Sequence, residues 1–101
     1  MFFIWQQDEN EEHIAKHGIE THEAEHVVRN ARRPYPRRIS GTKWLVKGRT
    51  IGRRLIQVIY VTRKPEEIDP RLLFPADRLA LQAGEQAVYV IHARELRRGE
   101  G

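Results

Sequence analysis

The stretch RRLIQVIYVTR, residues 53–63, decides the fold. Its middle is apolar at consecutive positions, which is typical of a central strand with both faces of the sheet covered. On one side of it, residues 42–49 alternate, with Trp44 and Val46 facing one way and cations facing the other. On the other side, residues 87–94 are again rich in β-branched residues. These three runs predict consecutive antiparallel strands.

The connections between these strands differ in length. Residues 50–52 predict a tight turn, in which Gly52 is expected to adopt the positive φ that such turns require. Residues 64–86 form a much longer connection with three prolines and a short helical pattern over 76–83. Connections of that length are uncommon in a compact domain, so we expect a functional loop or lid there.

The N-terminal third predicts two helices. The first is expected over residues 8–16, with Asp8 or Asn10 as its N-cap and acidic residues in its first turn, where the helix dipole favours them. The second is expected over residues 21–30, with Thr21 as its N-cap. Two helices followed by antiparallel strands indicate helices packed against one sheet.

The remaining segments complete this interpretation. Residues 2–5 predict a short buried strand rather than a signal peptide, because no basic start or long apolar stretch is present. Residues 31–38, with two prolines, predict an irregular connection. A chain of 101 residues supports one core. We therefore expect a single α+β domain over residues 1–101, with two N-terminal helices on a small antiparallel sheet of three to four strands.

Composition excludes several classes of protein. The chain has no cysteine, so disulfides, a thiol nucleophile and cysteine metal sites are excluded, and a reducing cytoplasm is the expected location. No apolar run approaches the length of a membrane span, so no membrane partner is expected. The sequence lacks a phosphate-binding glycine loop, and its single serine, Ser40, has no nucleophile-elbow context.

Charge is distributed unevenly along the chain. Residues 1–28 contain seven acids and one lysine, whereas residues 29–54 contain ten Lys or Arg and no Asp or Glu. An ordinary solvated surface mixes both signs, and crowded like charges repel one another. The basic block therefore predicts a polyanionic partner, most simply a nucleic acid, with an acidic protein as the alternative.

Two pairs of histidines have the spacing of metal ligands on a helix. His13 and His17 are four residues apart, and so are His22 and His26, which places each pair on one helical face. No third ligand is evident for either pair. A polar helix face is the simpler interpretation, so no metal and no other cofactor is predicted.

Metal-independent cleavage of RNA requires fewer special residues. The substrate supplies its own nucleophile, the 2′-OH, and the protein must move protons and neutralise the charge of the phosphorane. His92 and Arg94 lie two residues apart on the last predicted strand and so share a face. Arg53 begins the neighbouring strand and is expected to lie beside them. Strand ends often carry arginine, so a purely structural role for this group is the alternative.

Several short motifs, in this order and spacing, carry a resemblance to a known family. They are Phe3–Trp5, the Ile14–Ile19 stretch IAKHGI, Glu23-Ala24 with Val27-Val28, Gly52-Arg53, and the Val88–Glu95 stretch VYVIHARE. Together they resemble the BrnT-type toxins of bacterial type II toxin–antitoxin systems. The sequence departs from that pattern at Gln6, where the family commonly has Asp, and at His92, where it commonly has Ser.

The resemblance implies a RelE-like fold and an endoribonuclease that acts on messenger RNA, free or on the ribosome, and so inhibits translation. It also implies a cognate antitoxin, usually a small DNA-binding protein. The polar positions that match the family are Lys16, His17, Arg53 and Arg94.

The sequence thus predicts a catalytic group and a set of RNA-binding cations. The catalytic residues are expected to be Lys16, His17, Arg53, His92 and Arg94. The RNA-binding residues are expected to be Arg32, Arg33, Arg37, Arg38, Lys43, Lys47, Arg49 and Arg54. The leading alternative is a basic module that binds nucleic acid without cleaving it.

Overall fold

The computed structural model describes residues 1–64, 67–68, 71, 73–82, 84–97 and 99. The elements follow one another as β1 (Phe2–Phe3), the π-helical turn η1 (Gln7–Glu11), α1 (Glu12–Ala15), α2 (Thr21–Arg29), β2 (Arg37–Ser40), β3 (Lys43–Arg49), β4 (Leu55–Arg63), α3 (Pro75–Gln82) and β5 (Ala87–Glu95). The predicted α+β class is confirmed. Among these elements, no helix is long and apolar enough to cross a bilayer.

The sheet has five strands in the order β1-β5-β4-β3-β2, with β4 at its centre. The expectation of a wholly antiparallel sheet of three to four strands is wrong in two respects. Phe2 and Phe3 pair in parallel with Ala87 and Val88 at one edge. Arg37–Ser40 pairs antiparallel with β3 at the other edge, where part of an irregular connection was expected.

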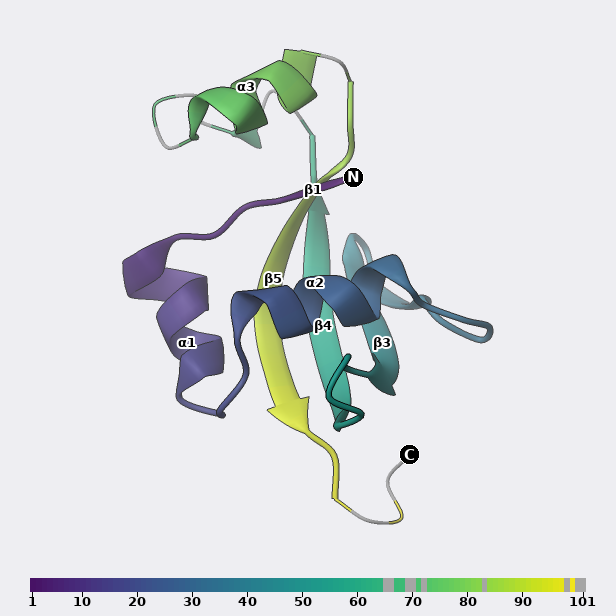
Figure 1. Ribbon diagram of the computed structural model, residues 1–101. Helices are drawn as coiled ribbons and strands as arrows, with labels where there is room; N and C mark the ends of the chain where they lie inside the picture. The colour runs from purple at the N-terminus through teal and green to yellow at the C-terminus, as the bar shows by residue number, and fades with distance from the viewer. Residues whose placement is uncertain (65–66, 69–70, 72, 83, 98, 100–101) are drawn as a thin grey trace.

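One face of the sheet carries the main core. Alternate residues of β4, namely Ile56, Val58 and Tyr60, are buried there, and Trp44 and Val46 lie opposite Tyr60 and Val58 on β3. The predicted alternation of β3 is therefore confirmed. In Figure 1, α2 crosses this face and α1 lies beside β5. The two helices thus bury one side of the sheet.

The opposite face is largely open, contrary to the expectation that β4 is covered on both sides. Ile59 and Val61 on that face of β4 are half-buried. At the β1 end, Leu73 from the long connection packs with Phe2 and Ala87 in a second, smaller apolar cluster. Leu73 and Ile68 thus cover one end of the open face. Part of the lid expected over residues 64–86 lies outside the described residues, and the lid stays a prediction.

The helix starts also differ from expectation. The N-cap of α2 is Glu20, one residue before the predicted Thr21, and it forms a capping box with Glu23. The N-cap of η1 is Gln6, so neither Asp8 nor Asn10 is the N-cap that the sequence predicted. The buried Asn10 side chain instead accepts a hydrogen bond from the Gln6 N–H at 2.8 Å and donates one to the Ile4 oxygen at 2.9 Å. Asn10 therefore ties η1 to the strand before it.

In the turn before β4, the residue with the unfavourable backbone conformation is an arginine. Arg53 has φ of 69°, and among the described residues it is the non-glycine position with positive φ. The glycine expected to take this conformation, Gly52, does not take it. The Arg53 N–H donates to the Thr50 oxygen at 2.9 Å, which closes the turn.

Candidate functional site

Three histidines from two elements meet at the β5 side of the sheet. His13 lies on α1, His17 lies just beyond its end, and His92 lies on β5. Their ring centroids are 5.6 Å apart for His13 and His17, 6.0 Å for His13 and His92, and 5.4 Å for His17 and His92. One ring nitrogen of each lies within 4.8 Å of the other two. We call this group the histidine cluster.

Local structure explains how the cluster forms. His13 and His17 are one helical turn apart, and Ile14 between them is fully buried and anchors this segment in the core. On β5 the register shifts, because Val90 pairs with Tyr60 while His92 pairs with Ile59. Ile91 is therefore the extra residue of a β-bulge, a feature that bends a strand and redirects the side chains after it.

The electrostatic environment of His92 disfavours its charged form. Partial burial lowers the pKa of His92, and the neighbouring His17, His13 and Arg94 lower it further. The neutral form of the His92 imidazole, which has a ring nitrogen lone pair to offer, is therefore favoured. His13 and His17 are exposed.

The open face of the sheet carries cations, of which Arg94 lies beside the histidine cluster. Arg94 follows His92 by two residues and pairs with Gln57, which in turn pairs with Lys47 on β3. Neighbouring strands are about 4.8 Å apart, so the backbones of Arg94 and Lys47, two strands apart, are separated by about 10 Å. Lys43 shares the face of Lys47 by alternation. Lys16, at the end of α1, is exposed and lies 3.9 Å from Glu12.

Arg53 does not lie in this group. His92 pairs with Ile59, six residues further along β4 than Arg53, whereas the chain next to Arg53 lies against the end of β5. The expectation that Arg53 lies beside His92 and Arg94 is therefore wrong in position. The reason is the register, which aligns Leu55 with the residues after Arg94.

A cationic groove of about 600 Å³ lies between the end of α2 and β3. Its lining includes five of the predicted cations: Arg32, Arg33, Lys47, Arg49 and Arg53. The side chain of Arg49 donates to the backbone oxygen of Arg53 at 3.0 Å, and Tyr35 adds an aromatic ring to the lining. The basic block thus forms a real concave surface.

The other predicted RNA-binding residues do not line the groove, and each has its own contacts. The Arg37 guanidinium lies 5.7 Å from the centre of the Tyr35 ring, and the Arg38 side chain donates to the Gly41 oxygen at 2.8 Å. Arg54 instead bridges Glu23 at 3.2 Å and Glu95 at 3.1 Å. The hydrogen bond to Glu95 is the main cause of the raised pKa of Arg54. Geometry gives Arg54 a structural role.

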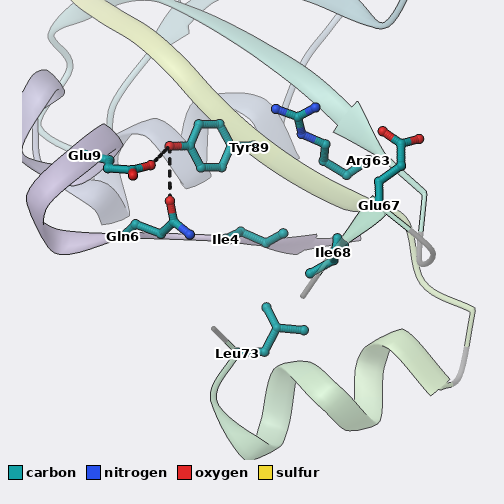
Figure 2. A pocket seen from close by; sticks show the side chains of 8 residues that line it. All are labelled: Ile4, Gln6, Glu9, Arg63, Glu67, Ile68, Leu73 and Tyr89. Atoms are coloured by element: carbon teal, nitrogen blue, oxygen red, sulfur yellow. Dashed lines mark hydrogen bonds between the residues drawn. The ribbon is translucent and has the colours of Figure 1, made fainter. Parts of the chain in front are cut away.

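A second, mixed pocket of about 340 Å³ lies where the long connection meets β1 and β5. The Tyr89 hydroxyl donates to the Glu9 carboxylate at 3.0 Å and lies 3.4 Å from the side-chain oxygen of Gln6. Figure 2 draws both contacts as dashed lines. Arg63 lies 5.7 Å from the centre of the Tyr89 ring. Desolvation, followed by the bond to Glu9, raises the pKa of Tyr89. The hydroxyl is therefore a donor held in place, not a base.

Sequence reasoning missed His13 as a site residue. Its spacing from His17 was visible, but the third histidine comes from the other end of the chain. The second pair lies elsewhere, with His22 3.2 Å from Glu20 and His26 beside Asn30. Comparison with protein-family models, curated proteins and solved structures found no match to this chain.

Proposed function

We propose that the protein is an endoribonuclease of the toxin class, which cleaves RNA by attack of the 2′-OH without a metal ion. The observation that carries the proposal is the histidine cluster beside Arg94, at the border of an open, cationic sheet face. Imidazoles can both accept and donate protons near neutral pH, and a guanidinium can hold a phosphate with two hydrogen bonds.

In this mechanism, one imidazole of the cluster takes the proton from the 2′-OH as its oxygen bonds to phosphorus. A second, protonated imidazole gives a proton to the departing 5′-oxygen as the P–O5′ bond breaks. The products are a 2′,3′-cyclic phosphate and a free 5′-OH. Arg94 balances the negative charge on the phosphorane, and Lys16, the residue before His17 in the chain, is proposed to assist it.

The cationic groove supports the binding of flanking RNA. A single strand follows a positively charged groove through its phosphates and stacks bases on aromatic rings, and Tyr35 supplies such a ring. In this proposal Arg53 belongs with the groove rather than with the reacting phosphate. Its role is to bind, which revises the catalytic role expected from sequence.

The test is cleavage of a defined RNA by the purified chain in the presence of a chelator. We expect products ending in 2′,3′-cyclic phosphate. His92→Gln should lower the cleavage rate by about a hundredfold or more, the usual contribution of general acid–base catalysis. His22→Gln is the matched control and should cleave normally, because His22 lies away from the cluster.

A basic module that binds RNA without cleaving it is the second candidate, favoured by the groove alone. Under that reading, RNA affinity falls steeply with salt and no cyclic phosphate appears. Equal rates for His92→Gln and the parent chain would sink the catalytic proposal even if some cleavage were seen, because contamination would then explain the products.

The proposal extends to the fold family and to the protein partner. The order of strand, two helices and antiparallel strands supports a RelE-like topology. The motifs around Lys16, His17 and Arg94 support a BrnT-type toxin with a cognate antitoxin as its protein partner. Co-expression with a small open reading frame from the adjacent gene position should then rescue cells from growth arrest.

A further inference from the structure

We propose that His13, His17 and His92 form a binding site for one divalent transition-metal ion, with Zn²⁺ as the best fit. The inference rests on the geometry of the three rings and does not depend on RNA cleavage. It also differs from the sequence interpretation, in which the first pair of histidines had no third ligand.

The distances suit zinc after a small adjustment. Tetrahedral Zn²⁺ holds imidazole nitrogens at about 2.0–2.1 Å, which places ligand nitrogens roughly 3.3 Å from one another. One nitrogen from each ring already lies within 4.8 Å of the others. His13 and His17 are exposed, so their rings can close the difference by rotation about the side chain.

The chemistry of the donor set selects the kind of metal. All three ligands are imidazoles, and no carboxylate belongs to the group. Imidazole suits Zn²⁺, Cu²⁺ and Ni²⁺, whereas Mg²⁺ and Ca²⁺ require oxygen ligands. Three protein ligands also leave a fourth tetrahedral position open to water or to a ligand from another molecule. The site should therefore discriminate sharply against Mg²⁺.

Metal binding and proton transfer use the same atoms. A ring nitrogen that coordinates a metal cannot accept a proton from RNA, because its lone pair is occupied. A bound ion would therefore switch off the acid–base chemistry proposed above. Free metal in the surroundings would then regulate the site through occupancy alone.

The experiment is titration of Zn²⁺ into tag-free, chelator-treated protein, followed by calorimetry and by NMR of the histidine rings. We expect one ion per chain. The protein has five histidines, and the signals of three should move while those of His22 and His26 stay in place. Mg²⁺ should move none. No RNA is present, so failure here leaves the cleavage proposal untouched.

Variants define the ligands. His92→Gln and His13→Gln should each weaken Zn²⁺ binding by at least about tenfold. Substitution of residues that only hydrogen-bond to metal ligands already causes a loss of that size. The double variant His22→Gln/His26→Gln is matched in type and spacing and should bind as the parent does. Circular dichroism without metal checks that each variant folds, and His13→Gln is the safer variant because His13 is exposed. Absence of stoichiometric binding, or equal loss in the control, overturns the proposal.

Discussion

Arg53 adopts a backbone conformation that its side chain disfavours. Its φ of 69° lies in the left-handed region, which costs a non-glycine residue of order 1–3 kcal/mol. The strained residue is exposed and lines the cationic groove. Strain of this kind persists where the surrounding structure imposes it, here the closed turn between β3 and β4.

Two substitutions separate the strain from the charge. Arg53→Gly removes both, whereas Arg53→Ala removes the charge and keeps the strain. We expect the glycine variant to have a free energy of unfolding about 1 kcal/mol higher than the alanine variant, after allowing for glycine's greater freedom in the unfolded chain. Urea unfolding measures the difference. Equal stabilities would mean that the turn imposes no strain.

Residue-level patterns predicted part of the site. The spacing of His13 and His17 and the shared face of His92 and Arg94 were visible in the sequence. Their meeting was not, because it depends on how α1 packs against β5 and on the bulge at Ile91. Neither tertiary packing nor a one-residue register shift leaves a local signal in the sequence.

At the level of elements, Asn10 holds the entry to the first helix. Asn10→Ala leaves the Ile4 carbonyl and the Gln6 amide without the partners described above. The cost of such unsatisfied groups is about 1–3 kcal/mol, so we expect the free energy of unfolding to fall by that amount. Asp8→Ala, on the exposed side of η1, is the control for urea unfolding and should change little. A similar loss in both variants would point to helix propensity instead.

Elements with a strong periodic pattern were predicted with the most accurate bounds. Alternation and β-branched residues placed β3, β4 and β5 within a residue or two of their observed bounds. All four residues of β2 are exposed, so no hydrophobic pattern marks that strand. β1 lies within the short strand predicted over residues 2–5, but its parallel pairing with a strand from the other end of the chain was not predicted. Sequence periodicity cannot register such a contact.

On the scale of the whole molecule, charge is arranged by location rather than by total. The net charge is +4, yet the groove and the open sheet face concentrate cations on β3 and the segment before β2. Release of counterions from the phosphates should make RNA binding weaken steeply with salt. The position of the cations that are removed should then affect RNA affinity as much as their number does.

Two matched double variants test this. Arg32→Gln/Arg33→Gln removes two cations from the groove, and Lys64→Gln/Arg78→Gln removes two from elsewhere. In a plot of log affinity against log salt, the first should reduce the slope by about 1.4, because each contact to single-stranded nucleic acid contributes about 0.7. The second should leave the slope unchanged. Equal changes would indicate attraction by net charge alone, without a groove.

The pairing of β2 with β3 ends at Leu45, so the rest of β3 presents an unpaired edge. Exposed edges of this kind invite a strand from another chain and so promote aggregation. Lys47 and Arg49 lie on that edge, and a second copy would bring like charges against them. The cations of the groove should therefore also oppose the pairing of a second chain with this edge. Substitution of these cations by neutral residues should therefore increase aggregation. In the proposed function, RNA bound in the groove would cover the same edge and so prevent that aggregation.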